Sequence, residues 1–487
     1  MNSFKRKISG GLIALLAISS QMSRADIVEF IDNGTFNDLE ASAAIAANQT
    51  YLSLFLVGCT DDQTVGRDGC DGQTFQLWSN VREIAHTANE LLNDGPTQFS
   101  LGLDEAGLGF ALRWTAAEEY AAQGNLSSEF IGGQASSLAS RLTALRAGAS
   151  GFNVIGIANA QNSDEIAYIG PLGGASGDAS YGRWGGFLNV DLSSGDRAPT
   201  AREDAFDFAG SQVSFGGDYR FDSNWVGGVV MGISQQNIDF DGSQSIVEGS
   251  IEADGYSLMP FAMYQLDNWF YSAALGYQTM RFDTVREIRY PSLNLDIDSA
   301  NTTTVSDTKA TSVSLFFEAG YTWQVNKFSI EPFLNFKHSD TTVDEFVEED
   351  LNDSAFDLVV EEQNINSQEF TFGTKLQYTY TPSFGVWIPF FTFEAIKQNE
   401  NASRDIKAYY AQNSVSDGSV FSLPTEEQDS SYFAYTFGVS AVIRGGRQTK
   451  AGGSIGGDIQ GFLNYKTIQA LEGFNVDLYS FGVRYTF

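Results

Sequence analysis

Histidine, the side chain most often used for proton transfer near neutral pH, occurs only twice in the chain, as His86 and His338. His86 lies in a segment with helical periodicity, where a catalytic triad would combine it with a serine and an aspartate. The candidates are Ser79 or Ser100 as nucleophile and Asp94 or Asp104 as acid. No Gly-x-Ser-x-Gly turn follows a strand there. We therefore interpret His86 as a structural residue and predict neither an enzyme nor a cofactor.

The two cysteines, Cys59 and Cys70, enclose the short segment 60–69. In an oxidising compartment such a pair is expected to form a disulfide that closes a small loop. A metal site is the alternative, but no histidine lies near the pair. Several aspartates crowd the loop, yet they lack the alternate spacing and the final bidentate glutamate of a calcium loop. We predict a disulfide, a solvated acidic turn and no metal.

Residues 344–362 hold nine carboxylates and no basic residue. Weak binding of divalent cations is one interpretation of such a run. The other is mutual repulsion between the like charges, which favours disorder. We expect an extracellular loop in which repulsion and disorder prevail.

The whole chain of 487 residues carries a formal net charge of −33. This charge argues against nucleic acid as a partner, because a phosphate backbone binds lysine and arginine. The N-terminus has the features of a signal peptide: basic residues at 5–7, an apolar run over 8–18 and a small-x-small site at 23–25. We expect export with cleavage before Asp26, and no later stretch is apolar enough for a membrane helix.

Hydrophobic periodicity divides the remaining chain into two regions. Residues 26–150 have helical periodicity, with helices expected at 36–57, 74–92, 104–123 and 127–147. Residues 151–182 contain a glycine-rich stretch and are expected to be a flexible linker. From residue 183 to residue 487 the period is two, as in a β-strand. The expected strands are 184–190, 213–221, 225–233, 256–266, 269–281, 313–323, 330–336, 370–380, 387–395, 433–443, 455–465 and 479–487.

The connections between these strands alternate in length. Short ones fall at 222–224, 267–268, 326–327, 381–383 and 445–446, and long ones near 191–205, 240–250, 285–307, 342–366, 398–429 and 467–474. Outer-membrane barrels alternate short periplasmic turns and long outer loops in this way. The sequence therefore predicts an all-β transmembrane barrel of twelve antiparallel strands, preceded by a mainly α-helical region, in the outer membrane of a Gram-negative bacterium.

Charged side chains of the expected strands occupy the phase opposite to that of the aromatic residues. In the aromatic phase, which faces lipid, a cation at mid-depth would cost roughly 2–4 kcal/mol. We therefore predict that the charged residues line the lumen. They are Asp218, Arg220, Glu318, Glu331, Lys337, Lys375, Glu394, Asp458, Lys466 and Arg484.

The first and last strands carry recognisable motifs, Arg183-Trp-Gly-Gly-Phe187 and the segment 479–487 with its final phenylalanine. Through them, residues from about 180 to 487 resemble the C-terminal barrel of the autotransporters of type V secretion. The resemblance implies an assembly signal, formed by Phe481, Val483, Tyr485 and Phe487, that the barrel-assembly machinery reads. It also implies periplasmic chaperones and outer-membrane lipid as partners of a barrel that we expect to be monomeric.

The resemblance further implies the order signal peptide, passenger, pore helix and barrel. The N-terminal region, with the segment 107–117, is similar to a group of uncharacterised proteins that carry a short passenger before this barrel. Two family features are missing: a passenger repeat of about 20–30 residues and the paired asparagines at which some members cut their linker. The helix expected at 127–147 carries Arg141 and Arg146. It either threads the pore, with its arginines facing acidic residues, or packs on neighbouring helices.

These observations favour an outer-membrane autotransporter-type barrel that anchors and translocates or displays its own short N-terminal region at the cell surface. The alternative is an outer-membrane pore or structural barrel whose N-terminal region stays in the periplasm or plugs the lumen. The sequence identifies no surface ligand.

Overall fold

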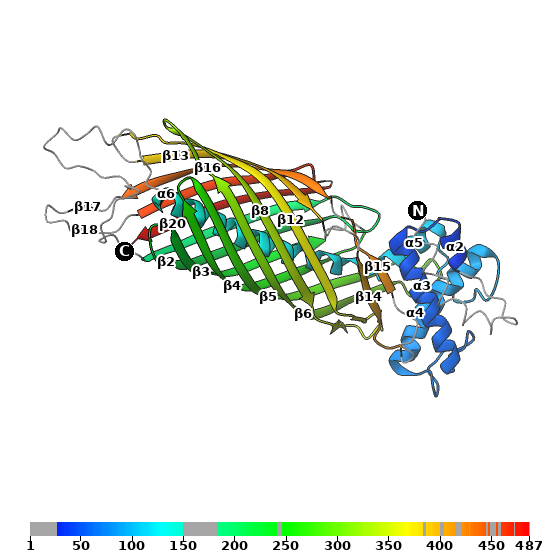
Figure 1. Cartoon of the computed structure of the whole chain (residues 1–487). Helices are drawn as coiled ribbons and strands as arrows, with labels where there is room; N and C mark the ends of the chain where they lie inside the picture. The colour runs from blue at the N-terminus through cyan, green and yellow to red at the C-terminus, as the bar shows by residue number, and fades with distance from the viewer. Residues whose placement is uncertain are drawn as a thin grey trace.

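A closed antiparallel β-barrel forms the larger part of the structure, which is a computed structural model (Figure 1). The structure describes residues 27–149, 184–240, 246–382, 386–399, 404–413, 421–427, 429–444, 447–448, 454–455, 459–471 and 473–486. The expected signal peptide at 1–25, the linker at 151–182, Asp458 and Phe487 lie outside the described residues.

Twelve long strands make the barrel, and each pairs with the next along the chain. They are β1 (Trp184–Arg197), β2 (Phe206–Arg220), β3 (Trp225–Phe240), β4 (Gly249–Leu266), β5 (Trp269–Tyr290), β6 (Ala300–Tyr321), β8 (Phe328–Val343), β12 (Gln363–Tyr378), β13 (Val386–Gln398), β16 (Ser431–Arg444), β19 (Ile459–Gln469) and β20 (Phe474–Thr486). The first and last strands close the sheet, with pairs from Gly185↔Thr486 to Arg197↔Phe474. Closure removes the open edge that lipid would not tolerate. The predicted twelve-stranded barrel behind a helical region is confirmed.

Side chains of the strands alternate between the two faces of the barrel wall. On β5, Trp269 is 49% and Leu275 54% exposed, whereas Phe270 between them is buried. The alternation follows from the pleat of a strand. Exposed tryptophans also gather where the short turns join the strands: Trp184, Trp225, Trp269, Trp323 and Trp387. Such a girdle is typical of a membrane–water interface.

Several strands continue well beyond the apolar band. β5 and β6 remain paired as far as Tyr290↔Ala300, so that only residues 291–299 form the loop. The expectation of a long loop over 285–307 is therefore wrong. Above the band the outward positions are polar, as at Arg281 and Asp283. The hydrophobic alternation stops there, while the hydrogen bonds between the strands continue.

Short strands extend the long-loop end of the barrel further: a separate sheet has the order β15-β14-β11-β9, and β10 pairs with β6. At the short-turn end, β7 pairs with β8 across the turn at 326–327. The bounds are β7 (Trp323–Val325), β9 (Phe346–Val347), β10 (Glu349–Asp350), β11 (Leu358–Val360), β14 (Asp405–Tyr410) and β15 (Phe421–Pro424). At the short-turn end, a small hairpin of β17 (Arg447–Gln448) and β18 (Ser454–Ile455) lies between β16 and β19 (Figure 1). The expectation of a short turn at 445–446 is therefore wrong. Residues 344–362 are thus ordered by strand pairing, and the expectation of disorder there is wrong.

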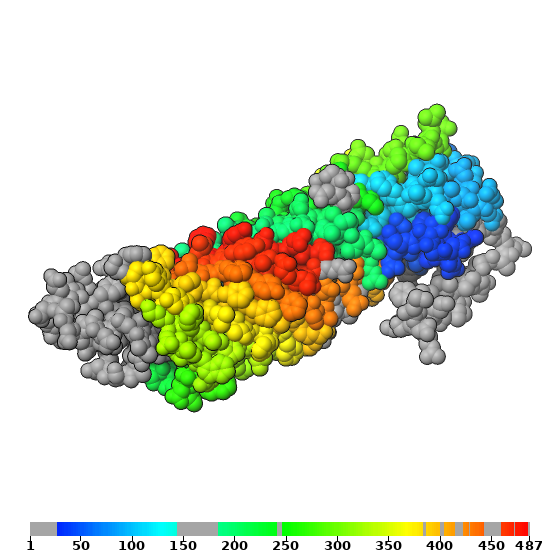
Figure 2. All heavy atoms as spheres, turned by 90° about the horizontal axis from the view of Figure 1, so that it is seen from above, coloured from blue at the N-terminus to red at the C-terminus, as the bar shows by residue number. Residues whose placement is uncertain are grey.

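Residues 27–121, called the cap below, form a compact helical unit at the long-loop end (Figures 1 and 2). Its elements are α2 (Val28–Asp32), α3 (Asp38–Val57), α4 (Gly72–Leu92), α5 (Glu105–Thr115) and the 3₁₀ turn η2 (Glu118–Ala121). Asn37 begins α3 with a capping box, in which its side chain accepts from the backbone N–H of Glu40. The helix expected at 104–123 is split, because Ala117 takes a left-handed backbone conformation (φ 58°).

The next helix, α6 (Ala122–Ala149), runs through the lumen and contacts β1 to β6 (Figure 1). A span of 28 residues has a length of about 42 Å at the helical rise, enough to cross a bilayer within the barrel. Of the two interpretations of this helix, the one that places it inside the pore is confirmed, because α6 lies against β1 to β6. Among the described residues, no helix is long and apolar enough to cross a membrane by itself.

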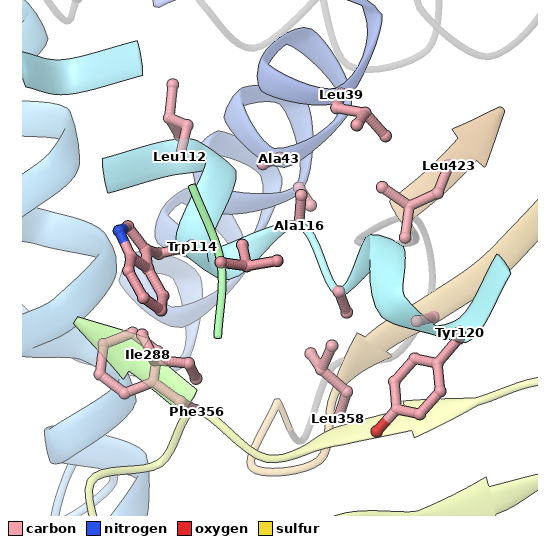
Figure 3. Packing of buried hydrophobic residues seen from close by; sticks show 14 of the residues in the cluster. Leu39, Ala43, Leu112, Trp114, Ala116, Tyr120, Ile288, Phe356, Leu358 and Leu423 are labelled. Carbon is pink, nitrogen blue, oxygen red and sulfur yellow. The ribbon is translucent and has the colours of Figure 1, made fainter. Parts of the chain in front are cut away.

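One hydrophobic core joins the cap to the barrel. It runs from Leu39 and Trp114 of the cap into Ile288 of β5 and Leu358 of β11 (Figure 3). Buried residues of β2, β4 and β14 belong to the same cluster. The cap therefore does not have a core separate from that of the long loops.

The position of the lipid boundary on the barrel wall can be tested with charged substitutions. Leu275→Arg puts a cation in the apolar band and should lower the free energy of unfolding by about 2–4 kcal/mol, because its charge cannot be solvated by lipid. Gln235 lies on the same wall but level with Arg281, through the pairs Gln235↔Asp254 and Asp254↔Arg281. Gln235→Arg should therefore cost at most about 1 kcal/mol. Denaturant unfolding in lipid vesicles measures both, and an equal loss in the two variants would contradict the proposed lipid boundary.

Candidate functional site: the docked cap and the lumenal helix

The lumenal helix α6 is held against β1 and β2 by polar contacts. Gln134 Nε2 donates to Ser214 Oγ at 3.1 Å, and Asn189 Nδ2 donates to Ser137 Oγ at 2.7 Å. All four side chains are buried. A buried polar group is costly unless it is hydrogen-bonded, so these contacts favour one seating of the helix.

Arg141 fastens the same helix closer to the short-turn end. Its guanidinium pairs with the carboxylate of Asp218 on β2 and lies 4.9 Å from the ring centre of Phe187 on β1. Arg141 and Asp218 are both buried. Removing one partner of a buried pair leaves an uncompensated charge, so the pair fixes α6 along the barrel axis.

The cap is hydrogen-bonded to three different long loops. Backbone N–H groups of Leu293 and Asn294 both donate to the carbonyl oxygen of Leu101, at 2.8 and 3.2 Å. On the second loop, Ser42 Oγ donates to the carbonyl oxygen of Ser422 at 3.0 Å. On the third, Asn80 Nδ2 donates to the carbonyl oxygen of Ser354 at 2.7 Å. The cap is therefore docked by backbone contacts as well as by apolar burial.

A buried ion pair organises the acidic segment 344–362. Arg286 of β5 donates from Nε and Nη2 to the two carboxylate oxygens of Glu348, at 2.8 and 2.6 Å. The same carboxylate accepts from Thr304 Oγ1 at 3.0 Å and from the backbone N–H of Leu358 at 2.9 Å. The segment lacks a cation of its own, and β5 supplies one. This compensation explains why it folds although its own sequence suggests repulsion.

A second buried ion pair links the cap to the loop between β1 and β2. Arg113 of α5 donates to Glu118 of η2 at 3.0 Å and also pairs with Asp204. The other oxygen of Asp204 accepts from the backbone N–H groups of Ile246 and Val247, at 3.1 and 3.0 Å. One guanidinium thus joins the cap to two barrel loops.

Glu119 lies between these two pairs without a hydrogen bond. Its carboxylate is 1% exposed, and neither oxygen has a hydrogen-bond partner. Burial raises the pKa of Glu119 to about 7, against the opposing attraction of Arg286. Glu348 and Asp204, the other charged groups that face it, raise the pKa further. The site therefore holds a carboxyl that titrates close to neutral pH.

The charged strand residues that the sequence places in the lumen include two lysines in ion pairs and one beside an aromatic ring. Lys337 pairs with Glu369 at 2.8 Å, and Lys466 pairs with Glu394 at 2.7 Å. Lys375 Nζ lies 4.2 Å from the ring centre of Phe390. The remaining wall positions are buried or half-buried: Asp218, Arg220, Glu318, Glu331 and Arg484. Asp458 lies outside the described residues.

Sequence reasoning missed Arg286, Glu348 and Glu119. Arg286 continues the inward phase of β5, but the expected strand ended at residue 281. The period-two alternation of β5, extended by a few residues, places Arg286 on the inward face and could have identified it. Glu348 lies in the acidic segment 344–362, and no local pattern in the sequence distinguishes it from the other carboxylates there.

The candidate triad does not assemble around His86. Its Nδ1 accepts from the backbone N–H of Phe99 at 3.2 Å, and its Nε2 lies 3.4 Å from Asp61 Oδ1. The two candidate serines bond elsewhere, Ser79 to the carbonyl oxygen of Phe75 and Ser100 to the backbone N–H of Gly102. His86 is fully buried and ties α4 to the loop that contains Asp61.

That loop is closed by the bond between Cys59 and Cys70, whose Cα atoms are 5.2 Å apart. Tyr51 of α3 donates to Asp61 Oδ1 at 2.6 Å and fastens the loop to a second helix. Among the described residues, no group of three or more His, Cys, Asp or Glu side chains is arranged to hold a metal ion.

The barrel with a helix in its lumen can be compared with known proteins. The family profile described as autotransporter beta-domain matches residues 186–454, which is more than half of the chain. The chain belongs to the autotransporter family. As an autotransporter, it is an outer-membrane barrel that displays an N-terminal passenger region, and barrels of this family are generally not enzymes. The resemblance stated from the sequence is confirmed.

Solved autotransporter structures are similar to this chain at low sequence identity. The translocator domain of NalP from Neisseria meningitidis is 12% identical over 64% of this chain and 90% of its own, with a TM-score of 0.45. The beta domain of the Bordetella autotransporter BrkA is 12% identical over 62% and 99%, with a TM-score of 0.40. The transport unit of AIDA-I from Escherichia coli is 12% identical over 70% and 99%, with a TM-score of 0.36. No curated protein matches the sequence.

The ion pair beneath the cap of this autotransporter can be tested by breaking it. Arg286→Gln leaves Glu348 buried without its cation and should destabilise the docked loops by about 3–5 kcal/mol. Limited proteolysis within residues 344–362 should become faster. Arg289→Gln is the matched control, because Arg289 is 47% exposed where it pairs with Glu248, and should cost at most about 1 kcal/mol. Equal protease sensitivity of the two variants would refute the structural role of Arg286.

The carboxyl of Glu119 should make the stability of the docked cap depend on pH. Because the folded protein holds this proton more tightly than the unfolded chain does, the contribution is complete below about pH 4.5 and is lost as pH rises through about 7. The loss is on the order of 3 kcal/mol. Hydrogen exchange of cap amides should accelerate over this range, and Glu119→Gln should weaken the dependence. The exposed Glu105→Gln is the control, and an unchanged profile in Glu119→Gln would exclude this carboxyl as the cause.

Proposed function

We propose that this autotransporter presents residues 27–121 on the outside of the cell as a retained cap. The observation that carries the proposal is the single hydrophobic core that the cap shares with the long loops. A cargo destined for release would need a core of its own. The cap instead depends on Ile288 and Leu358 of the barrel to bury Trp114 and its neighbours.

The direction of the barrel supports the outer location. Short turns of outer-membrane barrels face the periplasm, and long loops face outward. The cap docks on the long-loop end, and both barrel termini, β1 at Trp184 and β20 at Thr486, lie at the short-turn end. The chain thus passes once through the lumen as α6 before its first strand begins.

Retention is supported by the contacts of α6 and by the sequence. Arg141 pairs with Asp218 inside the lumen, while Arg113 and Arg286 form buried ion pairs at the mouth. Neighbouring asparagines, at which some family members are cut, are absent from the sequence. Release would require these buried pairs to be broken.

We also propose partners for assembly: the barrel-assembly machinery, periplasmic chaperones and outer-membrane lipid, around a monomeric barrel. The exposed outward phase of the last strand supports this. Phe481 is 44%, Val483 50% and Tyr485 39% exposed. Phe487, the fourth residue of the expected assembly signal, lies outside the described residues.

We propose that the cap performs no covalent chemistry. The burial of His86 and the distant bonding of Ser79 and Ser100 support this view. The cap's role is then presentation of a folded, disulfide-closed surface.

Cysteine labelling tests the location of the cap, because the native cysteines are bonded to each other. Glu105→Cys places a thiol on the exposed start of α5, and Ser223→Cys places one in a short turn. With a membrane-impermeant maleimide, intact cells should label Glu105→Cys strongly, and Ser223→Cys only after the outer membrane is opened. The opposite order would place the cap in the periplasm.

The same experiment tests retention. After labelling, the cells and the medium are separated, and the label on Glu105→Cys should remain with the cells on a chain that still contains the barrel. A labelled cap fragment in the medium would show that the cap is released.

A further inference from the structure

Two cavities of different character lie beside α6 in the lumen. The larger has a volume of about 1110 Å³, and eleven acidic and five basic residues line it among the described residues. The smaller, of about 90 Å³, lies near the short-turn end, because Gln377 and Val386 line it on either side of the short turn between β12 and β13. A volume of about 10–15 Å³ holds one water molecule. The smaller cavity therefore has room for a small polyatomic ion.

Basic side chains are the only charged groups among the described residues that line the smaller cavity. They are Arg141 of α6, Lys375 of β12 and Arg484 of β20. These three residues come from segments that are far apart in the sequence and meet only in the folded barrel. The smaller cavity is therefore positive, in contrast to the acidic lining of the larger one.

Carboxylates balance part of this charge from outside the smaller cavity. Asp218 of β2 pairs with Arg141, and Glu331 of β8 lies opposite Lys375 in the strand register. Neither carboxylate lines the smaller cavity. The two acidic residues thus approach the cations from other sides, and the positive charge toward the cavity is left for another anion.

Arg141 has buried donors that such an anion could use. Its side chain is 1% exposed, yet its Nε and Nη1 atoms have no hydrogen-bond partner. Arg484 of β20 and Arg220 of β2 both repel its positive charge. A buried donor without an acceptor is unfavourable, and nearby like charges add to the cost. An anion in the cavity would accept from the guanidinium and reduce the repulsion.

Neutral polar side chains complete the lining of the smaller cavity. They are the hydroxyls of Ser140, Thr143 and Ser440 and the amides of Gln377 and Gln460. The oxygen of Gln460 accepts from Arg484 Nη1 at 3.4 Å, which leaves its NH₂ group as a donor. Guanidinium, ammonium, hydroxyl and amide donors therefore border one small volume. Oxyanions such as phosphate bind to donor sets of this kind.

We propose that the smaller cavity binds one free inorganic oxyanion of the phosphate or sulfate class, held by Arg141, Lys375 and Arg484. The volume fits a tetrahedral anion and is too small for the glycerol of a lipid headgroup in addition. A bound anion bridges α6 to β12 and β20, which lie outside the wall of β1 to β6 that the helix packs against. This function goes beyond presentation of the cap and does not depend on where the cap lies.

Binding is tested with radiolabelled inorganic phosphate and the purified full chain, folded in detergent, at constant ionic strength in potassium chloride. We expect saturable binding at a single site. Phosphate should also raise the melting temperature of the barrel above its value in chloride alone, because a ligand of the folded state stabilises that state. Heat-modifiable migration in gels verifies that each protein is folded. A folded full chain that shows no saturable binding would overturn the proposal.

Substitutions test whether the named cations form the site. Arg484→Gln should weaken phosphate binding roughly tenfold or more, and Arg484→Lys, which keeps the charge, should retain part of the affinity. Lys466→Gln is the matched control, because this lumenal lysine pairs with Glu394 and does not line the smaller cavity. Lys375→Gln is a second test variant that keeps the experiment usable if Arg484→Gln does not fold. Undiminished phosphate affinity in the folded test variants would refute the site.

Competition identifies the form of the anion. Sulfate, which has the same tetrahedral shape, should displace the labelled phosphate. Glycerol 3-phosphate, which carries a lipid-like glycerol, should displace it much less well because the cavity has no room for the glycerol. Equal competition by glycerol 3-phosphate would contradict a site for the free anion.

Discussion

Closure of the sheet between β1 and β20 is the constraint on which the rest of the structure depends. Lipid can satisfy neither the N–H nor the C=O groups of an open edge, so the strands must form a complete ring. A ring of twelve strands, however, encloses more space than its own side chains fill. The chain partly fills that space with α6, and the direction of α6 brings the cap to the mouth. The position of the cap is thus a consequence of how the lumen is filled.

At the long-loop end of the barrel, which extends beyond the apolar band, ion pairs between distant segments stabilise the fold. Arg286 satisfies Glu348 from a strand about sixty residues earlier, and Arg113 joins η2 to the loop after β1. Removing such a pair from water costs free energy, and this cost is offset only when the carboxylate also accepts further hydrogen bonds. Glu348 accepts such bonds from Thr304 Oγ1 and from the backbone N–H of Leu358. The acidic composition of the loops is therefore compatible with order, because the few cations of the chain are placed where carboxylates are buried.

The sequence predicts those features that depend on the contrast between lipid and water. Alternation along β5 is visible as far as Tyr277 because its outward residues are apolar. Beyond Arg281 the outward residues are polar, so the continuing strand pairing leaves no hydrophobic signal, and the sequence predicts a loop at Arg286 where the strand in fact continues. The break at Ala117 also leaves no signal in the sequence, since alanine is a good helix former and rarely takes the left-handed conformation that it has here (φ 58°). The seating of α6 depends on Gln134, Ser137 and Arg141 finding partners on β1 and β2, which is a property of two distant segments together.

The helix α6 is seated asymmetrically in the lumen, against β1 to β6 and beside a cavity. Its polar and apolar contacts are concentrated on β1 to β6, where Phe130 lies against Gly255 and Leu138 packs in a buried cluster. The opposite face, at Gly132, makes no comparable contacts. A helix bulky on every face would have to match a wall that carries Lys337, Glu369, Lys466 and Glu394, at the expense of their mutual pairing. Because small residues such as Gly132 and Ser136 face the cavity instead, the ion pairs of that wall remain intact. The distribution of residues on α6 therefore fixes the helix on one side of the lumen and leaves a cavity on the other.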